Sequence, residues 1–453
     1  MAPITSRTRT TSRTRVIDRA CIIDWARTAS SARTATRVTA GVLAAAAITA
    51  AGVAPASAGV LGRPAAGHQA GSAAEQGTAR GRLVSATRLA AMPADRVRTW
   101  LASEDFDTAS VRHGVDTYRL VYRTVDTRGR ATTASGLLVL PRSRDRRLAT
   151  VSYTHGTTSY KPDAPSMADD VWGPGAAVTY AAAGFAAVAP DYLGLGEGPG
   201  VHPWKDVPSE TSASLDMLRA AREFAPRAGR VLDGRVFVTG FSQGASSALG
   251  LARALQGGAD PYFRVRAVAP ISGAYDFQGA ELPALLNGDV APKLSVAYTS
   301  YLLTSWNRIH GGIYKEPSEV FQEPYASRVE KYFDGTTPGD VMLGGLPDEL
   351  GDLLTPRGFE LLRHPSGTFA EALRVDAEVC KGWTPRVPVR LYKMAGDEQA
   401  VTANTDHCAA WFRDRGARVP VVDVGDRLYG GSRHLGSNLA GTARIVRWFG
   451  GLS

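Results

Sequence analysis

Val236-Phe237-Val238-Thr239-Gly240-Phe241-Ser242-Gln243-Gly244 is an apolar, strand-like run that ends in a G-x-S-x-G pentapeptide. The small residues at 245–249 suit a helix, so the pentapeptide lies at a predicted strand-to-helix turn. Gly240 and Gly244 leave the room that so sharp a turn requires, and the turn would hold Ser242 strained with its hydroxyl exposed. We interpret Ser242 as a nucleophile; the alternative is a serine in an ordinary turn.

Short apolar runs and helix-like stretches alternate on both sides of this motif. The runs are 149–154, 185–189, 236–239, 265–271 and 389–392, the helix-like stretches include 209–224 and 245–255, and 117–122 and 134–140 read as an antiparallel pair. Nearly continuous apolar runs are typical of strands buried on both faces of a parallel sheet. We therefore expect an α/β fold with a mostly parallel, doubly wound sheet over residues 83–453.

A long interval between two of these predicted strands breaks the alternation. Residues 275–381 contain helix-like, aromatic-rich segments with many Gly and Pro residues. A structureless loop of this length is improbable in a compact domain, so we expect an inserted, mainly helical cap, here called the insertion. Its apolar residues either roof the active site and bind an acyl chain or form a small core of the insertion itself.

Residues 1–58 have the pattern of a signal peptide. Arginines alternate with Thr and Ser, an apolar run covers 38–53, and Ala56-Ser57-Ala58 forms an A-x-A cleavage site. The apolar run is short for a membrane span, so a cleaved signal is favoured over an anchor. Residues 59–82, rich in Ala, Gly and Gln, are expected to form a flexible lead-in. These features predict a secreted, extracellular protein.

The basic charge of the chain belongs mostly to this leader. Residues 1–58 hold eight Arg and two Asp, which is +6 of the formal net charge of +9. The remaining Arg residues are interspersed with acidic ones, so nucleic-acid binding is not expected.

Cys21 leaves with the signal, and Cys380 and Cys408 remain as an even pair in an exported chain. We expect these two to form a disulfide, with two buried thiols as the alternative, and we find no metal-binding signature.

A nucleophilic serine needs a base, and the base needs an acid that fixes its tautomer. The histidines that follow the pentapeptide are His310, His364, His407 and His434. The first two fall within the insertion, and His407 lies in a helix-like run. His434 lies in a glycine-rich segment just before the last amphipathic helix. A base belongs on a loop at the C-terminal edge of the sheet, so we assign His434 as the base.

The acid is expected at the tip of the strand that precedes the last strand and helix. That predicted strand ends in Asp397, and Glu398 is adjacent and could substitute. Asp423 and Asp426 are nearer to His434 in sequence, but they lie on the next strand and its loop, where we expect them to be solvated. We therefore assign Asp397 as the acid.

The oxyanion that forms during acyl transfer needs backbone N–H donors. One is the N–H of Gln243, directly after the predicted nucleophile. The second is expected after the third strand of the fold, at His155-Gly156-Thr157, where we choose the N–H of Thr157 with Gly156 as runner-up. We expect His155 to shape this loop rather than transfer protons.

The glycine-rich segment 191–200 invites comparison with a dinucleotide-binding fingerprint. Pro199 stands where the third glycine of that fingerprint belongs, and no helix with free amides follows at the required distance. We interpret the segment as a tight loop that lines the catalytic cleft. No P-loop is present, and we expect no cofactor.

Together these motifs resemble the α/β-hydrolase family of bacterial secretory lipases, of the secreted actinobacterial type. The shared features are Tyr-Thr-His-Gly-Thr at 153–157, Pro-Asp-Tyr-Leu-Gly-Leu-Gly at 190–196, His-Pro at 202–203, Gly-Phe-Ser-Gln-Gly at 240–244, Asp-Glu at 397–398, Ala-Asn-Thr at 403–405 and His-Leu-Gly at 434–436. The likeness covers roughly residues 85–450. The chain departs from it at Gln399-Ala400, where members often carry Val, and at Ala245, where a second Gly is common. At both places we expect altered packing rather than lost chemistry.

The resemblance implies an α/β-hydrolase fold and a secreted serine carboxylic-ester hydrolase that cleaves lipid or other apolar esters through an acyl-enzyme. It implies the triad Ser242, Asp397 and His434, a cap that could contact a lipid interface, and no cofactor. A secreted serine peptidase or an acyltransferase with the same triad is the alternative. A peptidase should show a charged pocket for a peptide terminus, and no such cluster appears near the motifs. A non-catalytic binding protein of this fold would not need all three groups.

Overall fold

The computed structural model describes residues 80–453, so the predicted signal peptide, Cys21 and nearly all of the predicted lead-in lie outside the described residues. The strands are β1 (Leu83–Met92), β2 (Val115–Val125), β3 (Ala131–Pro141), β4 (Arg147–Thr154), β5 (Ala186–Pro190), β6 (Val231–Phe241), β7 (Arg264–Ile271), β8 (Leu391–Lys393) and β9 (Val421–Asp423). The helices outside the insertion are α3 (Ala94–Ala102), α4 (Trp172–Ala182), α5 (Val207–Phe224), α6 (Gln243–Gln256), α14 (Ala403–Asp414) and α15 (Arg433–Gly450), with short η3 (Lys161–Asp163) and η4 (Ala225–Ala228).

The strands form one sheet in the order β1-β2-β3-β5-β4-β6-β7-β8-β9. β1, β2, β3 and β5 pair antiparallel, and every pair from β5 through β4 to β9 is parallel. The expected mostly parallel sheet and the antiparallel pair of β2 and β3 are therefore confirmed. β1 was missed by the sequence analysis because this edge strand is largely exposed and carries no apolar run.

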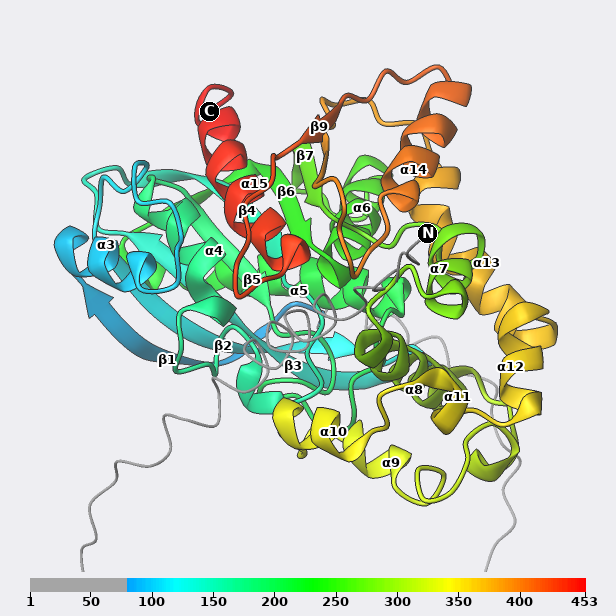
Figure 1. The fold of residues 1–453 in the computed structure, drawn as a ribbon. Coiled ribbons are helices and arrows are strands. Elements are labelled where there is room, and N and C mark those ends of the chain that lie inside the picture. The colour runs from blue at the N-terminus through cyan, green and yellow to red at the C-terminus, as the bar shows by residue number, and fades with distance from the viewer. Residues whose placement is uncertain (1–79) are drawn as a thin grey trace, which may run out of the picture.

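Helices cover both faces of the sheet (Figure 1). Along β3, Leu138 and Leu140 face the hydrophobic cluster that contains α5 and α6, whereas Leu137 and Val139 face the cluster that contains α3, α4 and α15. Successive strand residues point to opposite faces, so a run that is apolar at every position is buried on both sides. This alternation explains why the central strands read as continuous apolar runs.

The pairing of β4 with β6 brings two predicted site segments together. Thr154, the last residue of β4, lies opposite Gly240, and Phe241 lies opposite Ile271 at the end of β7. Because carboxyl ends of parallel strands meet at one edge of the sheet, the loop after β4 and the turn after β6 become neighbours.

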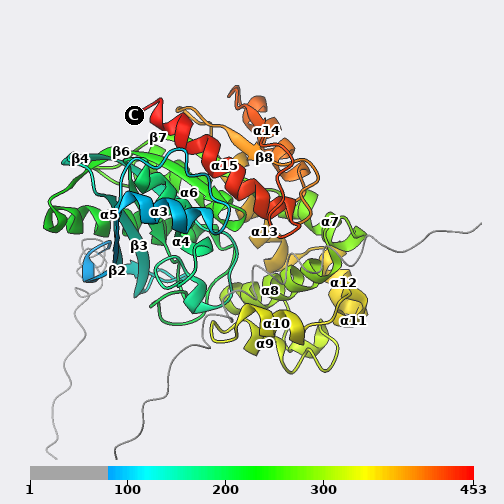
Figure 2. The ribbon, with the colours of Figure 1, turned by 60° about the vertical axis from the view of Figure 1, so that its left-hand side comes forward.

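The insertion between β7 and β8 is helical and gathers on one side of the molecule (Figure 2). Its elements are η5 (Phe277–Glu281), α7 (Leu282–Asn287), α8 (Pro292–His310), η6 (Pro317–Glu319), α9 (Val329–Tyr332), α10 (Gly339–Gly345), α11 (Leu350–Leu353), α12 (Pro356–Arg363) and α13 (Gly367–Lys381). Most of its large apolar side chains, including Tyr301, Leu302, Trp306, Phe333 and Phe369, are buried in one hydrophobic cluster of the insertion itself. The second of the two interpretations therefore holds for these residues.

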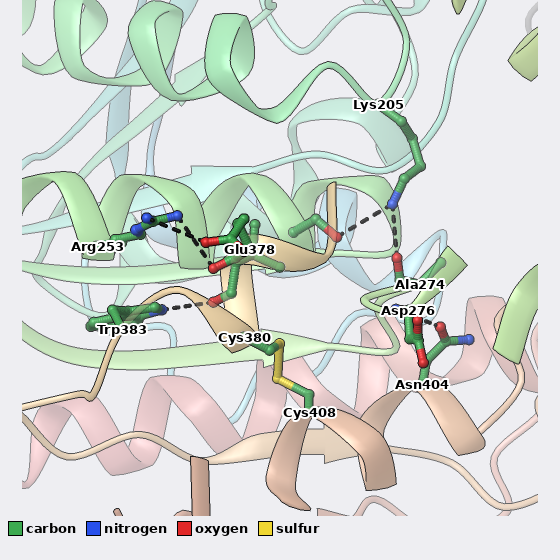
Figure 3. The surroundings of a disulfide bond; sticks show 11 residues. Lys205, Arg253, Ala274, Asp276, Glu378, Cys380, Trp383, Asn404 and Cys408 are labelled. Carbon is green, nitrogen blue, oxygen red and sulfur yellow. Dashed lines mark hydrogen bonds and ion pairs between the residues drawn. A yellow bond between two sulfur atoms is a disulfide. The ribbon is translucent and has the colours of Figure 1, made fainter. Parts of the chain in front are cut away.

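The C-terminal end of the insertion is fastened to the rest of the chain. Cys380 of α13 and Cys408 of α14 form a disulfide, as the sequence predicted (Figure 3). One turn earlier, the buried Asp376 lies 3.2 Å from the ammonium of Lys205, which also donates to the carbonyl of Ala274. Lys205 therefore contacts both the start and the end of the insertion. Within residues 80–453, no helix combines the length and the apolar character needed to cross a membrane.

Candidate active site

Ser242 occupies a strained turn between β6 and α6. Its φ is 56° and its ψ is −121°, in a region that side-chain-bearing residues rarely adopt. A Cβ on Gly240 would lie 2.1 Å from Thr154 Oγ1, and a Cβ on Gly244 would lie 2.1 Å from the Thr154 carbonyl oxygen. Both flanking positions therefore require glycine, for the steric reason inferred from the sequence. The turn presents Ser242, partly exposed, at the carboxyl edge of the sheet.

The structure brings Ser242, His434 and Asp397 into one line of hydrogen bonds. His434 Nδ1 lies 2.9 Å from both carboxylate oxygens of Asp397, and His434 Nε2 lies 2.9 Å from Ser242 Oγ. A carboxylate only accepts, so the proton sits on Nδ1 and Nε2 is left to accept from the serine hydroxyl. This tautomer is the one that a general base requires. His434 and Asp397 are buried, which shields the line from water.

Asp397 and Glu398 are adjacent but have different partners. Besides His434, Asp397 Oδ1 accepts from the backbone N–H groups of Gln399 at 3.0 Å and Ala400 at 2.9 Å. Glu398 instead accepts from the Ser432 hydroxyl and from the Arg433 N–H at 3.0 Å, at the start of α15. A carboxylate there is favoured by the helix dipole. Glu398 thus contacts the backbone that carries His434 rather than its ring.

His434 belongs to the last helix itself. We expected it on a loop before the last helix, but α15 begins at Arg433 with Ser432 as its N-cap, so His434 is in the first turn. Burial lowers the pKa of His434, and the charge and hydrogen bond of Asp397, together with the charges of Glu398 and Glu281, outweigh that effect. The pKa of His434 is therefore raised above its ordinary value.

The other candidate bases and acids lie elsewhere. His407 Nδ1 pairs with Asp276 at 2.8 Å, and His310 ends α8 against Trp306. His364 caps α12. Asp423 ends β9, where it accepts from the N–H of Gly425. In the described residues the structure therefore brings none of these groups into the line of hydrogen bonds at Ser242.

The two predicted oxyanion residues flank Ser242. Gln243 is the first residue of α6, where backbone N–H groups have no partner in a preceding turn. Thr157 lines two small cavities, and Ser242 lines both of them as well. Gly156 lies against Phe241, whose ring a Cβ would approach to 2.9 Å. His155 is buried, contacts the Gly156 carbonyl at 2.8 Å, and burial lowers its pKa to about 4, so it is neutral within this loop.

The two cavities beside Ser242 both have walls of apolar and polar groups. The first, of about 70 Å³, is lined by aromatic and apolar groups such as Trp172, Phe241 and Leu435. The second, of about 20 Å³, is lined by Trp204, Phe277 and Ala400, with Lys205 and Glu281 as charged groups. Such volumes hold roughly five water molecules and one water molecule, respectively. In this conformation both cavities therefore accept only small groups.

Two carboxyl groups that the sequence analysis overlooked line the larger cavity. They are Asp163, whose Oδ2 accepts from Thr158 Oγ1 at 3.3 Å, and Asp170, whose Oδ1 accepts from the Gly173 N–H at 3.2 Å. Burial and the charge of Asp170 raise the pKa of Asp163 to about 7. The sequence argument against a charged pocket is therefore wrong. The two residues come from the segment between the oxyanion loop and α4, which carries no recognisable motif.

The segment 191–200 does not line the cavities, contrary to our expectation. Among the described residues that surround Ser242, none comes from this stretch. It lies behind the oxyanion loop instead, where Tyr192 Oη donates to the His155 carbonyl at 3.0 Å. Asp191 accepts from the Ser135 hydroxyl at 2.6 Å and from the Ser166 N–H at 2.9 Å. The segment 191–200 therefore supports the oxyanion loop.

The departure at Gln399 creates a contact with the insertion. Tyr298 of α8 donates its hydroxyl hydrogen to Gln399 Oε1 at 2.8 Å, and Gln399 Nε2 donates to Ser432 Oγ at 3.2 Å. A valine could make neither bond. Gln399 thus links the insertion to the segment that carries Asp397.

Residues 80–453 contain no group of His, Cys, Asp and Glu side chains suited to hold a metal ion.

Comparisons with known proteins identify structural neighbours. No protein-family model matches this chain, and no curated protein matches it by sequence. The rice cell wall degrading esterase LipA from Xanthomonas oryzae has a TM-score of 0.71 at 26% identity, over 82% of this chain and 97% of LipA. A putative hydrolase from Legionella pneumophila has a TM-score of 0.73 at 24% identity, over 82% and 98%. Candida antarctica lipase A has a TM-score of 0.54 at 15% identity, over 77% of each chain. The chain has the α/β-hydrolase fold.

Proposed function

We propose that this chain is a serine carboxylic-ester hydrolase of the secretory lipase type, with Ser242 as nucleophile, His434 as base and Asp397 as the acid. The observation that carries the proposal is the line of hydrogen bonds from Asp397 through His434 to Ser242 at a strained strand-to-helix turn. Similarity to the Xanthomonas esterase supports an ester as substrate. A binding protein would gain nothing from such a line at that turn.

The mechanism is acyl transfer in two steps. His434 Nε2 takes the hydroxyl proton while Ser242 Oγ attacks the ester carbonyl, and the N–H groups of Gln243 and Thr157 donate to the oxyanion. The protonated His434 then gives its proton to the departing alcohol, which leaves an acyl-serine. Water enters, His434 removes one of its protons, and the water oxygen attacks the acyl carbonyl. Collapse of this second intermediate breaks the bond to Ser242 Oγ, which regains its proton from His434, and releases the acid.

The same proposal covers export and the insertion. Residues 1–58 act as a cleaved signal, and the Cys380–Cys408 disulfide suits an oxidising compartment. The insertion acts as a cap: Tyr298 lines both cavities beside Ser242. The side of the cap that carries Tyr298 would contact the substrate or a lipid interface.

Hydrolysis of p-nitrophenyl esters from acetate to palmitate by the purified protein tests the proposal. The two cavities hold only small groups, so we expect acetate and butyrate esters to have a higher kcat/KM than palmitate. A maximum at palmitate would contradict this expectation and would show that the insertion moves to open a long acyl site. A folded protein that leaves every ester intact would overturn the ester hydrolase.

A serine peptidase is the second candidate, because Asp163 and Asp170 line the cavity beside Ser242. Paired carboxyl groups could receive the ammonium of a peptide N-terminus. The raised pKa of Asp163, about 7, leaves that group only partly charged at neutral pH, which weakens this alternative. Aminoacyl p-nitroanilides separate the two: cleavage of these amides at rates above those of the esters would favour the peptidase.

The raised pKa of His434 predicts the pH dependence of activity. The base works only when its imidazole is neutral, so kcat/KM should be low at acid pH and should rise as His434 loses its proton. Because the pKa of His434 lies above the ordinary value of 6.5, we expect the midpoint of this rise above pH 6.5. A profile of kcat/KM against pH with a short-chain ester measures it. A midpoint well below pH 6.5 would show that Asp397 does not hold His434 in its charged form.

A further inference from the structure

The segment 202–210, which runs from the loop after β5 into the first turn of α5, contacts both residues that we assigned to the oxyanion hole. The sequence analysis noted His202-Pro203 as a shared motif, and the mechanism gives it no role. Trp204 donates its indole N–H to Thr157 Oγ1 at 3.0 Å. His202 and Glu210 hold the side chain of Gln243. One short segment therefore reaches both sides of the predicted oxyanion position.

Both hydrogens on the side-chain amide nitrogen of Gln243 have a hydrogen-bond acceptor. His202 Nδ1 lies 2.9 Å from the Leu193 carbonyl and so carries the ring proton, which leaves Nε2 to accept from Gln243 Nε2 at 2.9 Å. The second amide hydrogen goes to Glu210 Oε1 at 2.6 Å. Burial lowers the pKa of His202 to about 3, so this ring stays neutral and keeps its acceptor. The side chain of Gln243 is thus fixed by His202 and Glu210.

Thr157 has a different anchor, which also involves the insertion. The Trp204 ring stacks with two tyrosines of α8, with centroids 5.9 Å from Tyr298 and 4.8 Å from Tyr301, and with interplanar angles of 9° and 7°. Trp204 is buried within the hydrophobic cluster of the insertion although it belongs to the α/β part. Tyr301 Oη also donates to the Thr158 carbonyl at 3.2 Å. Helix α8 therefore holds the Trp204 ring in the plane that its N–H needs to reach Thr157.

We propose that Trp204 is a positioning residue for the oxyanion hole, which fixes the loop at Thr157 through its indole N–H. This inference rests on the proposed function. Oxyanion stabilisation depends on donors placed in advance about 2.7–3.1 Å from the developing charge. Misplacement by about 1 Å costs roughly 10²-fold in rate. A hydrogen bond to the Thr157 side chain restrains the backbone N–H of the same residue, so its loss should lower kcat more than it changes KM.

Trp204→Phe and Thr157→Val form a double-mutant cycle on this contact. The first keeps a stacking ring and removes the donor, and the second keeps the branched shape and removes the acceptor. We expect Trp204→Phe to lower kcat about 10-fold, less than the 10²- to 10³-fold loss of a whole oxyanion donor. In the Thr157→Val background it should have little further effect, because the bond is already gone. Thr157→Ser keeps the hydroxyl and should retain most of the activity.

A matched control separates this effect from the general cost of losing a buried indole. Trp383, which lines neither cavity beside Ser242, donates its N–H to the Val379 carbonyl at 2.7 Å and is also buried. Trp383→Phe should lower the melting temperature by a similar amount and leave kcat unchanged. Two outcomes would overturn the inference. One is an equal loss of kcat in Trp204→Phe and Trp383→Phe. The other is a loss of kcat in Trp204→Phe that is the same whether residue 157 is Thr or Val.

The rate at which a fluorophosphonate labels Ser242 gives a second readout that does not depend on the natural substrate. Phosphonylation also builds negative charge on an oxygen, so labelling of Trp204→Phe should slow in parallel with kcat. Normal labelling of the wild type with an unchanged rate in Trp204→Phe would overturn only the role of Trp204. A folded wild type in which Ser242 is not labelled at all would overturn the proposed function and this inference with it.

Discussion

Ser242→Ala is expected to lower kcat by about 10⁵- to 10⁶-fold while the fold stays intact. The substitution removes the only atom that forms the acyl-enzyme, and losses of this size are typical when a triad nucleophile is removed. The backbone cost should be small, because serine and alanine both carry a Cβ and are equally strained at φ 56°. Hydrolysis of p-nitrophenyl butyrate and a thermal unfolding curve measure the two effects separately.

The control for this variant is a serine outside the active site. Ser300 lies within α8 and donates to the Val296 carbonyl at 2.8 Å, away from the line of hydrogen bonds. Ser300→Ala should retain the wild-type kcat. If Ser242→Ala kept more than about a hundredth of the wild-type activity, the nucleophile would be elsewhere, or the chemistry would proceed without a covalent intermediate.

The sequence predicted the central sheet and the identity of the three groups at Ser242, for physical reasons that are local. Strands buried on both faces read as continuous apolar runs, and Asp397 lies shortly after one of them, β8, which ends at Lys393. Gly240 and Gly244 are required because a side chain at either position would clash with Thr154 on the neighbouring strand. The G-x-S-x-G motif contains both glycines, so this requirement can be recognised from the sequence alone. The roles of the three groups remain predictions that the variants must test.

The contacts made across long sequence distances could not be predicted in this way. Trp204 reaches Thr157 and stacks with tyrosines about a hundred residues away, and no spacing rule links these positions. Asp163 and Asp170 reach the cavity only because the segment after β4 folds back beside Ser242. In the same way, most helices of the insertion other than α8 and α13 are short and cover its own core, so their bounds depend on packing more than on periodicity.

Asp397→Asn should cost about 10⁴-fold in kcat, by analogy with the loss of the acid in other serine triads. The asparagine amide can donate to Nδ1, which favours the tautomer with the proton on Nε2 and so removes the acceptor for the Ser242 hydroxyl. Loss of the negative charge should also lower the pKa of His434, because the charge and hydrogen bond of Asp397 are what outweigh burial there. Residual activity should therefore show an acid limb at lower pH than in the wild type.

Glu398→Gln is the matched comparison, since both variants turn a carboxylate into an amide at adjacent positions. Glu398 contacts the Ser432 hydroxyl and the first N–H groups of α15, so its loss should loosen the start of that helix and cost about 0.5–2 kcal/mol of stability. We expect kcat to fall by less than about 10-fold, because His434 keeps its carboxylate partner. If Glu398→Gln lowered kcat more than Asp397→Asn, Glu398 would be the acid, as the sequence alone allowed. The structure favours Asp397 because its oxygens lie 2.9 Å from the ring nitrogen, whereas those of Glu398 lie 3.4 Å from the backbone nitrogen of His434.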